Sequence, residues 1–232
     1  MRSKLLIKKG SNNKTSWTRL VMFSDRTDAG KQLGKKLEFL KGKDPLIFAI
    51  PRGGVVVADA IATVLGCKLD IIVSRKIGAP HNPELAIGAI LHDGSYFPNS
   101  EVVKMLQVPQ SYINLEKSIQ MKEIERRLIN YRGSMQYDLE NKIIVIVDDG
   151  IATGATILVA ALWVKKQKTK KVIIAVPVGS KDSIQKLRGI ADEVIVLHAP
   201  DFFNAVGEFY KDFEQVEDET VLEIMRKYGY AV

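Results

Sequence analysis

Short apolar runs alternate with helical patterns along most of the chain. Runs that are apolar at nearly every position are typical of strands buried on both faces of a sheet. They occupy residues 46–50, 69–75, 142–147, 171–178 and 193–198. Helices are predicted over residues 25–41, 54–65, 155–167 and 180–190. Because a helix separates most neighbouring runs, the pattern predicts an α/β fold with a doubly wound, mainly parallel sheet flanked by helices.

Residues 79–141 interrupt this alternation. They contain one further apolar run, at 85–91, which predicts a strand, and a charged helical pattern at 109–132 that begins at Pro109. A proline is common in the first turn of a helix. Charges of both signs recur along this pattern at helical spacing, which indicates a solvated face.

Length and composition indicate a soluble globular chain. With 232 residues, 46% of them hydrophobic, it suits one compact domain with a small appendage. The single cysteine, Cys67, excludes an internal disulfide framework, and no apolar run reaches the roughly 18 residues of a membrane helix. The charged N-terminus does not resemble a secretory signal. We therefore expect a cytoplasmic protein without a membrane partner.

The basic charge of the chain is concentrated at its N-terminus. The net charge is +7, and residues 1–43 hold 12 of the 34 basic residues but only 3 of the 27 acidic ones. A basic chain favours an anionic partner such as nucleic acid or a phosphorylated metabolite. Because the sequence shows no helix-turn-helix or zinc pattern, nucleic acid is the less favoured partner, and the excess charge describes the N-terminal segment alone.

The segment VIVDDGIATGATI at 145–157 is the strongest candidate for a binding site. It places Asp148 and Asp149 at the carboxyl end of a buried strand, where doubly wound sheets bind ligands. The small residues that follow lead into a helix, and backbone N–H groups there can cradle a phosphate. Paired carboxylates suit sugar hydroxyls or a Mg²⁺-bound water. This combination points to a sugar phosphate, and the alternative is an ordinary strand–turn–helix junction with Asp and Thr as caps.

Two further segments lie at the ends of predicted strands. Arg52, Gly53 and Gly54 form a tight turn after the run at 46–50, and Arg75 and Lys76 lie where the next run ends. Arginine suits phosphate oxygens, and glycine permits backbone conformations that other residues resist. Taken alone, the first segment is equally consistent with a structural turn, and the second with a solvated pair of cations.

Together, the three segments resemble type I phosphoribosyltransferases, and most closely a phosphoribosyltransferase-like subgroup distinct from the adenine, hypoxanthine and orotate enzymes. The segment at 145–157 resembles the family signature for phosphoribosyl pyrophosphate (PRPP). It departs from the signature at Gly150, where the family usually has an apolar residue, and at Ala152, where Ser or Thr is usual.

The resemblance implies a Mg²⁺-dependent enzyme that transfers ribose 5-phosphate from PRPP to a nitrogenous base and releases pyrophosphate. Asp148 and Asp149 would hold the ribose, with Mg²⁺ nearby and bound mainly through PRPP and water. The 5-phosphate would lie against Gly150, Ala152, Thr153, Gly154, Ala155 and Thr156. Pyrophosphate would contact Arg52, Gly53, Gly54, Arg75 and Lys76. The catalytic set would be Asp148, Asp149, Arg75 and Lys76.

The resemblance also implies a core at 25–200, within which 79–141 would supply a mobile loop and a long helix, and a small hood that recognises the acceptor. The hood would come from the basic segment 1–24, from a C-terminal helical element at 201–232, or from both. Phe202, Phe203 and Tyr210 could stack on a planar base, although packing within the C-terminal element is the favoured alternative. The chain could also form a homo-oligomer.

A regulatory module on the same fold is a second interpretation. Such a module would bind PRPP or a nucleotide without turnover. Arg52, Arg75 and Lys76 favour catalysis, because sensing the 5-phosphate alone would not require groups that neutralise pyrophosphate.

Overall fold

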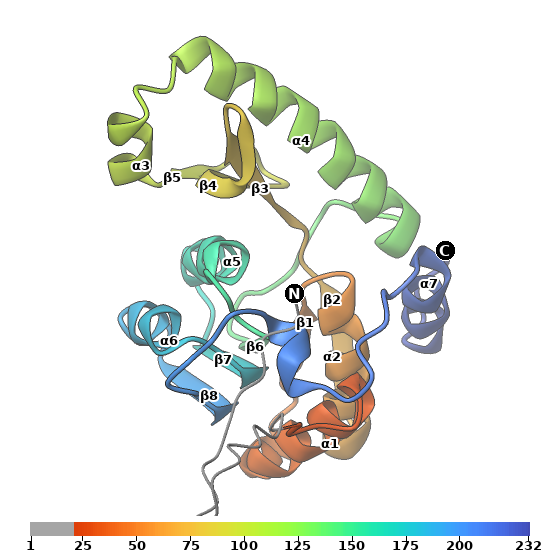
Figure 1. The fold of residues 1–232 in the computed structure, drawn as a ribbon. Helices are drawn as coiled ribbons and strands as arrows, with labels where there is room; N and C mark the ends of the chain where they lie inside the picture. Colours follow the sequence, from red (N-terminus) through yellow and green to blue (C-terminus); the bar gives the residue numbers. More distant parts are fainter. Residues whose placement is uncertain (1–20) are drawn as a thin grey trace, which may run out of the picture.

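A computed structural model describes residues 21–232 of the chain (Figure 1). The expectations for residues 1–20 lie outside the described residues. A five-stranded, fully parallel sheet with the order β2-β1-β6-β7-β8 forms the centre of the molecule. Its strands are β1 (Leu46–Ala49), β2 (Lys68–Ile71), β6 (Ile143–Val147), β7 (Lys171–Val178) and β8 (Glu193–His198). The predicted parallel sheet is confirmed.

Helices cover both faces of this sheet, as a doubly wound fold requires (Figure 1). They are α1 (Arg26–Lys36), α2 (Gly53–Leu65), α5 (Ala155–Lys165) and α6 (Lys181–Arg188), each close to a predicted helix. Alternate residues of the strands face opposite cores. Ile47 and Ala49 of β1 pack in the core that holds residues of α1 and α2, whereas Phe48 packs in the core that holds residues of α5. This double burial explains why β1, β6 and β7 are apolar at nearly every position.

Asp25 begins the first helix, since its side chain accepts a hydrogen bond from the N–H of Asp28. The helix is shorter than predicted. It ends at Lys36 and is followed by a 3₁₀ turn, η1 (Glu38–Leu40). Gly42 lies in the next turn with a φ of 78°.

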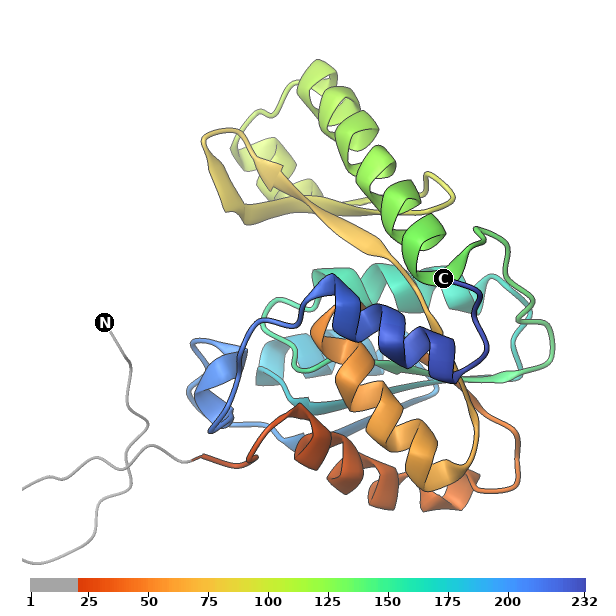
Figure 2. The ribbon, with the colours of Figure 1, turned by 90° about the vertical axis from the view of Figure 1, so that its right-hand side faces the viewer.

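The middle of the chain forms a second, smaller layer beside the sheet (Figure 2). An antiparallel sheet contains β3 (Ser74–Ala79), β4 (Asn82–Leu91) and β5 (Tyr96–Pro98), followed by α3 (Ser100–Met105) and α4 (Gln110–Arg132). The predicted strand at 85–91 and the long charged helix are confirmed. The apolar run at 69–75 is divided, because β2 ends at Ile71 and β3 begins at Ser74 in the other sheet.

This layer occupies the part of the chain where we expected a mobile loop and a helix. The residues expected in the loop, from Ala79 onward, form the turn of the β3–β4 hairpin, with His81 at a φ of 63°. The second layer of the fold comes from residues 74–132, and the source of a hood, expected from one or both ends of the chain, stays a prediction.

The first part of the C-terminal segment packs against α1 and the end of β7. It contains the 3₁₀ turn η2 (Val206–Phe209) and α7 (Asp218–Lys227). Phe23 pairs with Tyr210 as an isolated bridge, and both pack with Phe209 and Val178 in a third apolar cluster. Within residues 21–232, no helix combines the length and the apolar character that crossing a membrane needs.

A buried ion pair holds α4 to the main sheet. Arg132 donates from Nε and Nη2 to the two carboxylate oxygens of Asp70, at 2.7 and 3.0 Å, and the side chains of Arg132 and Asp70 are 10% and 7% exposed. Asp70 lies on β2 and Arg132 is the last residue of α4. This contact therefore fixes the end of α4 that lies closest to the parallel sheet.

We predict that Asp70→Ala lowers the free energy of unfolding by about 3 kcal/mol, because it leaves the guanidinium of Arg132 buried without its partner. Urea denaturation measures the effect. The matched control is Asp138→Ala, which removes an exposed pair with Lys142 and should leave the midpoint unchanged. Equal effects of the two variants would contradict the anchoring role of Asp70.

Candidate functional site

Two acids occupy the carboxyl end of β6, the central strand of the parallel sheet. Asp148 and Asp149 directly follow Val147, and the N–H of Asp149 donates to Oδ1 of Asp148 at 2.8 Å. Arg26 of α1 donates from Nε to Oδ2 of Asp149, also at 2.8 Å, and the two side chains are 11% and 16% exposed. One of the two acids thus has a buried cation as its partner.

The C-terminal segment supports this ion pair. The guanidinium of Arg26 lies 3.8 Å from the ring centroid of Phe213 and donates from Nη1 to the carbonyl of Glu214 at 2.8 Å. The hydroxyl of Tyr210 donates to the carbonyl of Asp149 at 2.6 Å. These contacts fix both the backbone and the side chain of Asp149.

The placement of Tyr210 contradicts its predicted role as an acceptor platform. Tyr210 is fully buried, and its ring packs against Phe23 and Phe213. The packing alternative also describes Phe203, whose ring stacks on Phe209 with centroids 5.4 Å apart. Phe202 is 75% exposed, and its contact with an acceptor stays a prediction.

Burial sets the protonation of the two acids. It raises the pKa of Asp148 well above the usual value, and the negative charge of Asp149 raises it further. Burial also raises the pKa of Asp149, but there Arg26 opposes the shift through its charge and its hydrogen bond. Asp148 is therefore the acid that takes up a proton first as the pH falls.

The turn after β1 packs directly on the acids. The Pro51–Arg52 peptide is cis, and α2 begins at Gly53. A Cβ at position 53 would lie 1.9 Å from Oδ2 of Asp149, and one at position 54 would lie 2.9 Å from the carbonyl oxygen of Val147. The two glycines are thus needed for the approach of this turn to the end of β6, whether or not they also contact a ligand.

Arg52 is paired with the C-terminal helix. Its Nη1 lies 3.1 Å from Oδ1 of Asp218 and 3.7 Å from Oε2 of Glu217. Asp218 also accepts a hydrogen bond of 2.5 Å from the hydroxyl of Tyr131 in α4. The start of α7 therefore connects the turn after β1 with the long helix.

Arg75 and Lys76 lie within β3, not in a loop beyond a strand of the main sheet. Nε of Arg75 donates to Gln120 of α4 at 2.9 Å, and Lys76 forms an ion pair with Glu84 at 3.1 Å. Burial lowers the pKa of Arg75, and the nearby charge of Arg127 lowers it further. None of the ion pairs among residues 21–232 includes Arg75.

One cavity of about 380 Å³ brings the three predicted segments together. Its wall consists of Ile50, Pro51, Arg52, Gly53, Ser74, Arg75, Lys76, Arg127, Asp148, Asp149 and Thr156. The cavity lies where the second layer meets the carboxyl end of the parallel sheet. Four cations and two acids therefore surround one space, although they come from distant parts of the sequence.

Sequence reasoning missed two cations, Arg26 beside Asp149 and Arg127 in the wall of the cavity. Arg127 lies on α4, its side chain is 19% exposed, and its Nε donates to Glu123 at 2.7 Å. Glu123 also binds Arg126, and the two arginines hold the pKa of Glu123 at about 2. The helical pattern indicated a solvated face, and no local signal distinguished Arg127 from its exposed neighbour Arg126.

The predicted phosphate loop connects β6 with α5. Thr156 lines the cavity, whereas Gly150, Ala152, Thr153, Gly154 and Ala155 do not contribute to its wall. Gly154 caps α5 with a φ of 72°. One departure from the family signature has a local explanation, because a Cβ at Gly150 would lie 2.5 Å from Val206 of η2. The backbone carbonyl of Ala152 accepts hydrogen bonds from Ser180 and Ser183, and nothing in the structure explains the alanine side chain there.

The acids can contribute only part of a metal site. Among residues 21–232, no group of three or more His, Cys, Asp or Glu side chains could hold a metal ion. Mg²⁺ prefers six oxygen ligands and commonly keeps several waters or substrate oxygens. The donor set here, Asp148 and Asp149, fits an ion held mainly by a phosphorylated ligand and by water.

Comparison with known proteins identifies the family. The model of the phosphoribosyl transferase domain matches residues 26–214. Two Mycobacterium tuberculosis proteins, from strains CDC 1551 / Oshkosh and H37Rv, are 41% identical over 204 residues, and their names class them provisionally as phosphoribosyl transferases. The match covers 88% of this chain but 46% of those proteins, so the chain spans about half of their length.

A solved structure supports the same relationship. The crystal structure of TT1426 from Thermus thermophilus is 38% identical, with a TM-score of 0.75, and the match covers 89% of this chain and 98% of that one. The matched family region includes α1, the parallel sheet and every predicted segment of the site. The chain therefore belongs to the phosphoribosyl transferase family.

Proposed function

We propose that the cavity binds PRPP with Mg²⁺, and that the chain transfers its 5-phosphoribosyl group to a nitrogenous base with release of pyrophosphate. The proposal rests on the charges of the cavity wall, which has an acidic part and a basic part. Asp148 and Asp149 lie at the end of β6, and Arg52, Arg75, Lys76 and Arg127 surround the same space. Family membership and the names of the relatives support PRPP as the donor.

The proposed orientation follows from the charges. The 5-phosphate would lie at residues 152–156, where the first turn of α5 offers unpaired N–H groups and a positive dipole end. The ribose hydroxyls would donate to Asp148 and Asp149. Pyrophosphate would then lie among the four cations, since arginine binds phosphate oxygens with two parallel hydrogen bonds.

Catalysis would consist of charge stabilisation and positioning. The bond from C1 of the ribose to pyrophosphate breaks, a bond from C1 to the acceptor nitrogen forms, and the proton that this nitrogen loses passes to the released pyrophosphate or to water. Negative charge grows on the leaving group, where the cations stabilise it, and positive charge grows on the ribose, near the acids. Bound Mg²⁺ would supply further neutralisation of the pyrophosphate oxygens.

Arg26 has a supporting role in this scheme. By opposing the effect of burial on the pKa of Asp149, it keeps that acid available as a hydrogen-bond acceptor for the ribose. The carboxyl of Asp148 is neutral more readily, and it accepts its hydrogen bond from the N–H of Asp149.

A PRPP-sensing module without turnover is the second candidate. The pairing of Arg52 with Asp218 and Glu217 favours it, because this arginine would have to share or exchange partners to bind pyrophosphate. The four cations of the cavity favour catalysis. Three of them, Arg75, Lys76 and Arg127, come from the second layer and would lie at pyrophosphate, the proposed leaving group.

The test of the proposal is pyrophosphate release. Purified full chain with PRPP and Mg²⁺ should release pyrophosphate when the correct base is added from a panel of purines and pyrimidines. Saturable PRPP binding with no release across the panel would favour the sensing module. Absence of both binding and release would overturn the proposal.

We predict that Asp148→Asn reduces pyrophosphate release at least about a hundredfold, because it removes an acid beside the developing charge. The same variant should be more stable than the wild type at pH 7, since burial raises the pKa of Asp148 and its ionisation opposes folding. This gain should vanish near pH 4, around the usual carboxyl pKa of about 3.9, where the wild-type group is protonated.

The matched variant is Asp149→Asn, which leaves the buried guanidinium of Arg26 without its charged partner. It should also lose activity, but its thermal midpoint should fall at pH 7. Unchanged activity in either variant would contradict the assignment of the acids. Equal thermal midpoints for the two variants would contradict the different environments described for Asp148 and Asp149.

We predict that Arg127→Ala raises the KM for PRPP about tenfold or more, since a hydrogen bond to a charged group contributes about 1.5–3 kcal/mol. The control is Arg126→Ala, at an exposed neighbour that pairs with the same Glu123 and does not line the cavity. Steady-state kinetics should show little change for this control. Similar KM values for the two variants would contradict a contribution of Arg127 to PRPP binding.

A further inference from the structure

The first turn of α7 places one carboxylate at the centre of a group of polar contacts. Oδ1 of Asp218 accepts hydrogen bonds from Nη1 of Arg52 at 3.1 Å and from the hydroxyl of Tyr131 at 2.5 Å. Its Oδ2 lies 3.9 Å from Nη1 of Arg126. Tyr131 is one turn beyond Arg127 on α4. A single carboxylate therefore connects Arg52 with the helix that supplies Arg127 to the cavity.

The protonation states of these groups suit a permanent contact at neutral pH. Burial, and then the hydrogen bond to Asp218, raise the pKa of Tyr131 to about 12, so its hydroxyl stays a donor. The same hydrogen bond is the main cause of the lowered pKa of Asp218, which is therefore an anion. Its charge opposes the mutual repulsion of the arginines that gather around it.

Packing holds α7 in place beside α2. Val221 is fully buried in the core that includes residues of α2. At the end of α7, the hydroxyl of Tyr228 donates to Oδ1 of Asp59 on α2 at 2.8 Å. The two helices lie side by side and run in the same direction (Figure 2). Because α7 is fixed at both ends, the carboxylate of Asp218 has a defined place beside the start of α2.

The contacts of Arg52 leave other donors of its guanidinium for a ligand. Among residues 21–232, its hydrogen bond to Asp218 and its ion pairs with Asp218 and Glu217 all use Nη1. The guanidinium also carries N–H groups on Nε and Nη2, and these have no acceptor in the described part of the chain. Arg52 can therefore keep Asp218 as its partner while it donates to phosphate oxygens.

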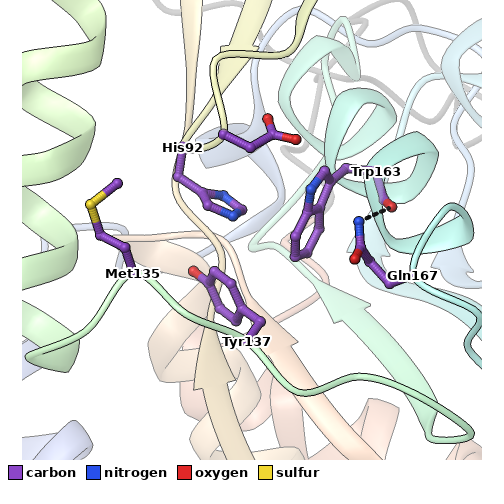
Figure 3. Close-up of a pocket in the computed structure, with 6 residues that line it drawn as sticks. His92, Met135, Tyr137, Trp163 and Gln167 are labelled. Atoms are coloured by element: carbon purple, nitrogen blue, oxygen red, sulfur yellow. Dashed lines mark hydrogen bonds between the residues drawn. The ribbon is translucent and has the colours of Figure 1, made fainter.

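The second layer has further attachments that do not involve Tyr131. The buried ion pair at the end of α4 is one of them. Just beyond β4, the ring of His92 packs on those of Tyr137 and Trp163, with centroid distances of 4.8 and 4.6 Å. Figure 3 shows these three side chains turned toward one another from separate segments. Loss of the Tyr131 hydroxyl should therefore leave the layer attached.

We propose that Asp218 and Tyr131 are positioning residues of the transferase site. Asp218 holds the guanidinium of Arg52 where pyrophosphate would bind, and Tyr131 holds the carboxylate of Asp218. α7, which the structure describes in full, contributes no residue to the cavity wall, so it acts on the site through Arg52. The inference rests on the proposed function, because it takes the surroundings of Arg52 as the pyrophosphate position.

Calorimetric titration with two ligands tests this proposal. The full chain is titrated with PRPP and with ribose 5-phosphate, each with Mg²⁺, because the second ligand lacks the pyrophosphate. Asp218→Asn and Tyr131→Phe should each weaken PRPP binding about fivefold, as expected for coupling between residues in contact. They should leave ribose 5-phosphate binding unchanged. Equal weakening of both ligands would show a general structural role and would overturn the proposal.

The matched control is Glu219→Gln, in the same turn of α7. Glu219 is an exposed acid that pairs with Arg226 at 3.0 Å, and its loss should change neither affinity. In an Arg52→Ala background, Asp218→Asn should have no further effect on PRPP binding, because the residue that it positions is absent. An equal loss in both backgrounds would contradict the positioning role.

The wild type distinguishes this inference from the proposed function. A wild type that binds neither ligand would overturn the proposed function and the inference with it. A wild type that binds PRPP, with unchanged or tighter binding in Asp218→Asn and Tyr131→Phe, would overturn the positioning role alone.

Discussion

The buried ion pair between Arg26 and Asp149 is the contact on which the site depends. Two adjacent ionised carboxyl groups at the end of a buried strand lower the stability of the fold, because burial favours their neutral forms and their charges repel. Arg26 offsets part of this cost for Asp149, at a distance of 2.8 Å. Without a cation at this place, nothing from α1 would oppose the effect of burial on the pKa of Asp149, and a protonated carboxyl is a weaker acceptor for sugar hydroxyls.

The ion pair lies where the residues before α1 meet the segment that follows η2. Residues near Phe23 exchange backbone hydrogen bonds with the C-terminal segment, from Met22 to Phe209 and from Lys211 to Phe23. This pairing brings Phe213 and Glu214 onto the guanidinium of Arg26. Tyr210 and Phe213 thus act on the site through the backbone of Asp149 and through Arg26.

The sequence predicted the parallel sheet well, because full burial of a strand leaves a local signal. The segments around Arg52, Arg75 and Asp148, which the sequence singled out, line one cavity, although Arg75 lies within β3 and not at the end of a strand. Arg127 could not be found, because its role depends on the packing of a long helix against β3. The burial of Tyr210 and the true start of β3 likewise depend on contacts between distant segments, which local patterns do not encode. Glycines 53 and 54 were noted for ligand contact, whereas the structure adds their close approach to Asp149 and Val147.

The central claim is that one cavity holds the ribose at the acids and the pyrophosphate at the cations. A crystal structure of the full chain with PRPP and Mg²⁺ tests it most directly. The account predicts ribose hydroxyls on Asp148 and Asp149, the 5-phosphate at residues 152–156, and pyrophosphate among Arg52, Arg75, Lys76 and Arg127. PRPP bound elsewhere, or bound with its pyrophosphate at residues 152–156, would contradict it.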